Sequence, residues 1–235
     1  LELLEYRGYD SAGMAIVDET NGQVQIRKRA GRVADLEKVW KANPVNGICG
    51  IGHTRWATHG GVSDVNAHPH ASEDGTVAIV HNGIIENFVE IKQRLIVEYN
   101  VKFKSETDSE VIAHLIAAHM KNYSTLEDAV YAATLEMRGA YALVVVSSKD
   151  PNKIVAVRKD APLIAGIGKG ENFIASDIPA LMKHCKEIYL IENGEMVVVT
   201  ADENISANTM IRKMVFLPRY FIFASAYAHI DAANT

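Results

Sequence analysis

This 235-residue sequence predicts an α+β fold, and three observations support that class. Ten short runs alternate apolar and polar residues or are apolar throughout, as strands do. Five longer stretches place apolar residues at i, i+3 and i+4, which is typical of helices facing a core. The strands and helices do not alternate one by one, so the pattern indicates two stacked sheets with helical layers outside rather than regular βαβ units.

The predicted strands follow one another up to about residue 200. A hairpin is expected between the first two, because Asn21 and Gly22 both tolerate a positive φ. In order, the strands are expected at Gly13–Asp18, Gln23–Lys28, Gly47–His53, Val77–Val80, Tyr141–Ser147, Lys153–Arg158, Leu163–Ile167, Asn172–Ala175, Glu187–Ile191 and Glu195–Thr200.

The predicted helices carry recognisable start signals. Ser124 with Glu127, and Thr107 with Glu110, match the capping box, in which two side chains satisfy free N–H groups at a helix start. Asp177 is expected to cap the last helix, with a proline in its first turn, where a missing N–H costs nothing. The helices are expected at Val33–Ala42, Asn87–Tyr99, Asp108–Lys121, Leu126–Met137 and Ile178–His184.

The composition bounds the class of protein. With 48% hydrophobic residues the chain can bury one sizeable core. A formal net charge of −5 argues against a nucleic-acid partner. No apolar run approaches ~20 residues, so no membrane span is expected. Cys49 and Cys185 lie far apart with no metal spacing, which is typical of a reduced cytoplasmic protein rather than a disulfide framework.

The segment 53–61, His-Thr-Arg-Trp-Ala-Thr-His-Gly-Gly, is the strongest functional signal. It follows an apolar run from Gly47 to Gly52, so it should begin where a strand ends and a loop opens. Polar and aromatic side chains on such a loop are typical of ligand sites. Arg55 offers a planar fork of donors that matches a carboxylate. A small-molecule site is therefore predicted.

Five other motifs accompany this segment, at Glu5–Gly13, Asn66–His70, His81–Asn87, Ser105–Glu110 and Gly168–Asp177. Taken together and in this order, the motifs closely resemble the glutaminase domain of glutamine–fructose-6-phosphate aminotransferases, which are N-terminal-nucleophile glutamine amidotransferases. The resemblance covers about residues 1–200. A related amidotransferase acting on phosphoribosyl pyrophosphate is the nearest alternative, but its motifs read differently at Trp56–Thr58.

The resemblance implies a four-layer αββα sandwich of the N-terminal-nucleophile hydrolase type. It also implies a cytoplasmic enzyme that hydrolyses L-glutamine and passes ammonia to a sugar-phosphate isomerase domain, which makes glucosamine 6-phosphate. No cofactor, metal, nucleic acid or membrane is implied, and a homodimer is kept as an alternative.

The resemblance also assigns roles in the site. Arg55 would bind the α-carboxylate of glutamine, and Asp108 its α-ammonium. Asn82 and Gly83 would form the oxyanion hole. Arg7 would steady the region around the nucleophile. The other residues assigned to the substrate pocket are Trp56, Thr58, His59 and His68, the first three in a loop that closes over glutamine.

Each role has a structural alternative. Arg55 could belong to an internal ion pair, and Asp108 could serve a helix dipole. Trp56 could be a core aromatic, and Asn82-Gly83 is also the commonest hairpin dipeptide. His68-Pro-His70 could bring two imidazoles to one metal, but no carboxylate or thiolate stands at a familiar zinc spacing.

The chain begins at Leu1-Glu-Leu-Leu, which resembles the end of the helix that follows the nucleophile strand. The N-terminal cysteine is therefore expected to be missing, and this chain as printed is expected to have negligible glutaminase activity. Neither Cys49 nor Cys185 is expected to replace it, since each lacks a free α-amine as base.

The expected domains are 1–200, the glutaminase domain, and 201–235, a divergent tail without the isomerase domain. The alternatives are a glutamine-binding regulatory module without chemistry, and a gene fragment without function.

Overall fold

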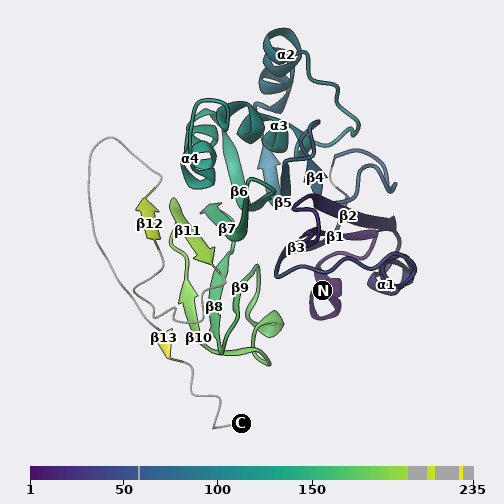
Figure 1. Ribbon diagram of the computed structural model, residues 1–235, viewed down its shortest axis with the longest axis vertical. Coiled ribbons are helices and arrows are strands. Elements are labelled where there is room, and N and C mark those ends of the chain that lie inside the picture. Colours follow the sequence, from purple (N-terminus) through teal and green to yellow (C-terminus); the bar gives the residue numbers. More distant parts are fainter. Residues whose placement is uncertain (58, 201–210, 215–227, 230–235) are drawn as a thin grey trace.

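The computed structural model describes residues 1–57, 59–200, 211–214 and 228–229 (Figure 1). Its helices are η1 (Glu2–Arg7), α1 (Val33–Ala42), α2 (Phe88–Tyr99), α3 (Glu110–His119), α4 (Leu126–Glu136) and η2 (Ile178–Ala180). Its strands are β1 (Ser11–Val17), β2 (Val24–Ala30), β3 (Cys49–Arg55), β4 (His70–Ala71), β5 (Val77–Ile85), β6 (Gly139–Ser147), β7 (Asp150–Lys159), β8 (Ile164–Gly168), β9 (Asn172–Ala175), β10 (Cys185–Leu190), β11 (Glu195–Thr200), β12 (Ile211–Met214) and β13 (Ala228–His229).

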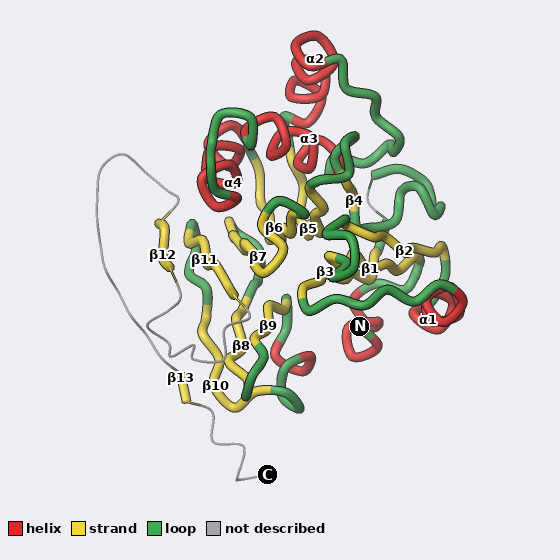
Figure 2. The backbone as a smooth tube through the Cα atoms, in the orientation of Figure 1, coloured by secondary structure: helices red, strands yellow, loops and turns green. Residues whose placement is uncertain are grey.

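The strands form three sheets in the described part of the chain. One has six strands in the order β12-β11-β7-β6-β5-β4, and two smaller ones run β2-β1-β3 and β13-β10-β8-β9. The two small sheets are not joined by a strand pair among the described residues, so β3 and β9 are both edge strands. Figure 2 shows α2, α3 and α4 gathered on one side of the six-stranded sheet, with α1 beside β1 and β2 away from them.

Three hydrophobic cores among the described residues hold these layers together, and β6 contributes to the two larger ones. Tyr141, Leu143 and Val145 pack with α2, α3 and α4, whereas Ala142 and Val144 pack toward β1 and β3. Successive side chains of a strand point to opposite faces, so a strand that is covered on both faces reads as a continuous apolar run. The predicted four-layer αββα arrangement is confirmed: three helices, the large sheet, the two small sheets, and α1 with η2 outside them.

The predicted elements correspond closely to the observed ones. Val33–Ala42, Asn172–Ala175 and Glu195–Thr200 have the predicted bounds. The Asn21-Gly22 hairpin joins β1 to β2, with Gly22 at φ 67°. Within the described part of the chain, no helix is long and apolar enough to cross a membrane.

Three local predictions were wrong. Ile178–His184 is only the short 3-10 helix η2, although Asp177 does cap it by accepting from the Ile178 N–H. The capping box at Ser124 is displaced by one residue, because Thr125 accepts from the Asp128 N–H. At Thr107 no capping box forms, since the Glu110 carboxylate accepts from the Lys104 and Ser105 N–H groups instead.

The predicted domain boundary at residue 200 and the tail 201–235 fall almost entirely outside the described residues. Within this tail, only residues 211–214 and 228–229 are described.

Candidate active site

One pocket of about 410 Å³ lies where β3, β5 and β9 face one another. Its lining residues come from the two edge strands β3 and β9 and from β5, β6 and β7 of the large sheet. Every predicted site residue that the structure describes lines it: Arg7, Arg55, Trp56, His59, His68, Asn82, Gly83 and Asp108. Thr58 lies outside the described residues. Further residues at its wall are His53, His81, Thr107, Ser109, Phe173 and Ser176.

Arg55 ends β3 and is buried, with 4% of its surface exposed. Its Nη2 donates to the carbonyl oxygens of His59 and Gly60, at 2.5 and 3.2 Å. Its Nη1 lies 3.9 Å from the Asp10 carboxylate. Arg55 therefore does take part in the internal ion pair that was the alternative role, and it also holds the following loop. A guanidinium carries five donors in a fork, so these contacts do not exhaust it.

Asn82 and Gly83 lie inside β5, opposite Ala142 and Tyr141 of β6. The strand predicted at Val77–Val80 is longer in the structure: β5 continues to Ile85, so Asn82-Gly83 does not form the hairpin turn that was its alternative role. Gly83 has a φ of 132°, and a Cβ there would collide with the carbonyl oxygen of Ala140. Only glycine fits this place, because an L-residue would meet both the unfavourable φ and the clash.

Asp108 is buried just before α3, which begins at Glu110. Its Oδ2 accepts from the Ile85 N–H at 2.8 Å, and its Oδ1 accepts from the Ser109 hydroxyl at 3.3 Å. An ionised carboxylate offers about four lone-pair positions, so it can accept further N–H donors. Asp108 thus has the capacity to hold an ammonium group.

The loop after β3 forms part of the rim. Trp56 has 62% of its surface exposed and packs edge-on against Tyr9, with ring centroids 5.5 Å apart. It is therefore not a core aromatic, which was the alternative role. Asp10 anchors the loop by accepting from the Ala57 N–H. His59 packs edge-on against Phe88, with centroids 5.9 Å apart.

Arg7 connects η1 to the other wall of the pocket. Its Nη1 donates to the Ser176 carbonyl at 3.5 Å and lies 3.3 Å from the Asp177 carboxylate. Tyr6 also donates to Asp177. Since Asp177 begins η2 next to β9, these contacts join the two sides of the pocket.

Four histidines cluster between β3, β5 and α3: His68, His70 and His81 are buried and His53 is half-buried. Of these, the sequence motifs gave only His68 a place in the site. The His53 and His68 rings stack with centroids 4.4 Å apart, and His68 meets His70 edge-on at 4.7 Å. His81 Nδ1 lies 2.8 Å from the Ser109 hydroxyl oxygen. No three or more His, Cys, Asp or Glu side chains among the described residues are arranged to hold a metal ion.

These histidines are held neutral by their surroundings. Burial lowers the pKa of His53 and of His81 to about 4 and that of His70 to about 3. Burial, helped by the neighbouring imidazoles, lowers the pKa of His68 well below its usual value. The signal in the sequence that could have located His53 and His81 is the period of two: each continues the inward face of a buried strand.

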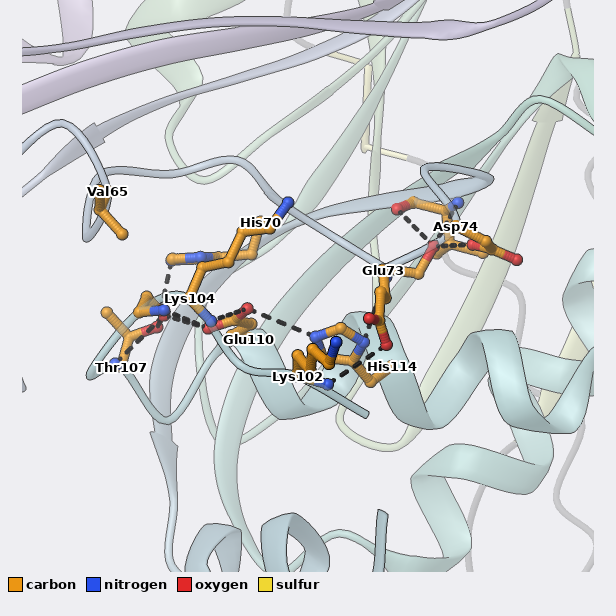
Figure 3. A network of polar contacts seen from close by, with 12 residues as sticks. Val65, His70, Glu73, Asp74, Lys102, Lys104, Thr107, Glu110 and His114 are labelled. Carbon is orange, nitrogen blue, oxygen red and sulfur yellow. Dashed lines mark hydrogen bonds and ion pairs between the residues drawn. The ribbon is translucent and has the colours of Figure 1, made fainter. Parts of the chain in front are cut away.

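A polar network connects His70 of this cluster to Glu110 (Figure 3). His70 Nε2 lies 3.2 Å from the Thr107 hydroxyl, which is 2.9 Å from that of Ser105. Ser105 donates to Glu110 at 2.7 Å. Burial pushes the pKa of Glu110 upward, but hydrogen bonds from His114, Lys104 and Ser105 outweigh it and lower the pKa to about 2. The carboxylate is therefore charged and fixes this end of the network.

Lys28 of β2 has a structural task. Its Nζ donates to the carbonyl oxygens of Val65, Ala67 and Pro69, at 2.9, 2.8 and 3.3 Å. These carbonyls belong to the segment that carries His68. Lys28 thus fixes one side of the histidine cluster.

Neither Cys49 nor Cys185 is among the described residues that line the pocket. Burial raises the pKa of the Cys49 thiol to about 11, and it also raises that of Cys185. A thiol with a raised pKa is a poor nucleophile at neutral pH.

Comparisons with known proteins give a consistent result. A family model described as a glutamine amidotransferase domain matches residues 12–223. The glutamine–fructose-6-phosphate aminotransferase (isomerizing) of Clostridium perfringens is 52% identical over 202 residues, 86% of this chain and 32% of that protein. The corresponding protein of Aquifex aeolicus is 49% identical over 203 residues, 86% of this chain and 33% of that protein. This chain therefore spans about a third of these relatives.

Among solved structures, the glutamine phosphoribosylpyrophosphate amidotransferase of B. subtilis superposes with a TM-score of 0.71 over 92% of this chain and 45% of that one. Its 24% sequence identity is evidence for the fold alone. The sequence is thus much more similar to the sugar-phosphate aminotransferases than to the enzyme that was the nearest alternative.

Proposed function

This chain belongs to the glutamine amidotransferase family, and from this membership we propose that its pocket binds L-glutamine for hydrolysis of the side-chain amide. In that reaction water converts glutamine to glutamate and ammonia. Arg55 binds the α-carboxylate, Asp108 binds the α-ammonium, and Asn82 with Gly83 stabilises the oxyanion that forms at the amide carbon. Trp56 and His59 belong to the loop over the ligand.

The observation that carries this proposal is the convergence of a guanidinium, a carboxylate and an Asn-Gly pair on one pocket of about 410 Å³. Free glutamine has two charged groups and one amide, so it needs a cation, an anion and donors for the amide oxygen. The residues that supply them come from segments about 25 to 50 positions apart in the sequence: Arg55 ends β3, Asn82 and Gly83 lie within β5, and Asp108 precedes α3.

We propose further that ammonia from this site serves the transfer reaction for which the relatives are named. An isomerase domain for the sugar phosphate would use it to convert fructose 6-phosphate to glucosamine 6-phosphate. The identity of about one half over 86% of this chain supports this substrate class over phosphoribosyl pyrophosphate.

Calorimetry with L-glutamine and L-glutamate tests the binding half of the proposal. Both should bind, and D-glutamine should bind much more weakly because its charged groups are exchanged in space. Arg55→Ala should weaken binding by about 2 kcal/mol, or roughly 30-fold in Kd, through loss of a charged pair. Arg55→Lys should restore only part of it, since an ammonium lacks the fork.

Two variants complete this experiment. Asp108→Asn should also weaken binding, because it removes the negative charge. Arg94→Ala is the matched control, since Arg94 pairs with Glu136 outside the pocket. L-glutamine binding that is unchanged by both Arg55→Ala and Asp108→Asn would contradict the proposed site. Ammonia release by the protein as its gene encodes it separates an enzyme from a binding module.

A further inference from the structure

We propose that His53 is a positioning residue that holds the Asn82 side chain in the one orientation that can stabilise an oxyanion. Nε2–H of His53 donates to Asn82 Oδ1, and the Asn82 NH₂ group is thereby turned toward the ligand. The inference rests on the proposed function, because it concerns the same amide hydrolysis.

The two side chains meet because of the strand period. Cys49 and Ile51 of β3 point into the core between the sheets, and His53 continues that face of the strand. Ala78 and Val80 of β5 point into the same core from the opposite sheet, and Asn82 continues their face. The pair therefore forms the polar end of an apolar layer, with His53 Nε2 2.8 Å from Asn82 Oδ1.

The tautomer of His53 decides which way the amide of Asn82 faces. If Nε2 carries the hydrogen, it donates to Oδ1 and leaves both N–H bonds of the amide available. If Nδ1 carries it, the amide must turn over and donate to the bare Nε2, which would aim its oxygen at the ligand. An oxygen there would repel the oxyanion instead of stabilising it.

Burial selects the first arrangement. His53 Nδ1 is buried and has no hydrogen-bond partner in the described structure. A hydrogen on Nδ1 would therefore be a buried N–H without an acceptor, and such groups are rarer in proteins than acceptors left without a donor. Asn82 Nδ2 donates to no side chain or carbonyl of the described residues, so it is free for a ligand.

The plane of the His53 ring is fixed from the other side. His68 stacks on it with an interplanar angle of 29°, and His70 packs on His68 at 78°. His70 is in turn held by Thr107, and the contacts lead on through Ser105 to the charged Glu110 (Figure 3). A ring that is held on its face and at its Nε2 cannot rotate without breaking one of these contacts.

Steady-state kinetics on the protein as its gene encodes it tests the inference. His53→Leu removes the donor and should lower kcat about 100-fold, as expected for loss of one oxyanion donor, with KM for glutamine changed less than about threefold. His53→Gln keeps an N–H donor at a similar reach and should recover at least tenfold of that loss. His119→Gln, on α3 outside the pocket, should have the activity of the parent.

A double-mutant cycle distinguishes positioning from a general structural effect. Asn82→Ala should lower kcat about as much as His53→Leu does, and the double variant should be no slower than Asn82→Ala alone. Multiplicative losses in the double variant would overturn the inference. So would a folded His53→Leu variant that retains kcat within threefold of the parent.

A measurement on the unaltered chain covers the case in which the variants do not fold. The ¹⁵N chemical shifts of His53 should be those of an Nε2-protonated neutral ring, and an Nδ1-protonated ring would overturn the inference. Absence of glutaminase activity in the protein as its gene encodes it would refute the hydrolysis in the proposed function itself, whereas an active protein that is insensitive to His53→Leu would refute only the role of His53.

Discussion

Lowering the pH from 7 to 5 should destabilise this fold through its buried histidines. In the folded chain the pKa values of His53 and His81 are about 4 and that of His70 is about 3, against 6.5 for an exposed ring. The unfolded chain therefore takes up protons below pH 6.5 that the folded chain does not bind. Stability is fully present above pH 6.5 and is lost as the pH falls toward 4.

The magnitude follows from linkage. Between pH 7 and pH 5, one such histidine should remove about 2 kcal/mol from the free energy of unfolding, so these three together should remove roughly 6 kcal/mol. Domains are commonly stable by only about 5–15 kcal/mol, so the loss should bring the chain close to unfolding. The pKa of Glu110 is lowered from 4.5 to about 2, so its titration affects stability only below about pH 4.5. Its contribution can therefore be separated from that of the histidines.

Urea unfolding followed by circular dichroism at pH 7, 6 and 5 measures this loss directly. His70→Gln should reduce the difference between pH 7 and pH 5 by about 2 kcal/mol, because one titrating ring is removed while a donor to Thr107 is kept. His119→Gln is the control on a histidine outside the cluster. A free energy of unfolding that differs by less than about 1 kcal/mol between pH 7 and pH 5 would refute the claim that the rings are held neutral by burial.

Three further predictions concern single residues. Gly83→Ala should destabilise the chain by more than about 2 kcal/mol, because the new Cβ would clash with the Ala140 carbonyl at a residue with positive φ. Gly61→Ala is the control: a Cβ at Gly61 would point into open space, so the melting temperature should change little. Lys28→Met should lower the free energy of unfolding in urea by about 2 kcal/mol or more, because three carbonyls lose a charged donor. Lys38→Met, on the exposed face of α1, should change it by less than about 0.5 kcal/mol. Equal effects of the two substitutions would contradict the structural role of Lys28. Burial raises the pKa of the Cys49 thiol to about 11, so Cys49 should react with a thiol reagent at pH 8 only after denaturant is added. Prompt labelling of Cys49 in the native chain would contradict this environment.

The sequence predicted the fold class and nearly all elements because period and turn chemistry are local. Strand β6 and helix α4 are each readable from their own residues. The extension of β5 through Asn82-Gly83 was not predicted, since that dipeptide ordinarily marks a turn and only pairing with β6 keeps it extended. The 3-10 helix η2 was also missed as such: it ends at Ala180, and the next residue, Leu181, is buried in the core with Ile164 and Ile188, which come from other segments.

The candidate site was predictable only as a set of residues. The motifs identified Arg55, Asp108 and Asn82, but nothing in them shows that Arg55 also holds the carbonyls of the next loop. The partners of His53 and Lys28 come from segments 29 to 41 positions away, and such contacts depend on the sheet order. The roles that the motifs assign remain predictions for the binding experiments.

The two edge strands beside the pocket have a consequence for its motions. β1 has a neighbour on each side in its sheet, whereas β3 and β9 each have one among the described residues. Backbone amides exchange with solvent through local opening, so those of β3 and β9 should exchange faster than those of β1 and β8. A ligand that touches both strands should slow their exchange together. Part of its binding free energy would then go into restraining the two small sheets relative to each other. The affinity of the site therefore depends on how rigidly these sheets are held as well as on the contacts to the ligand.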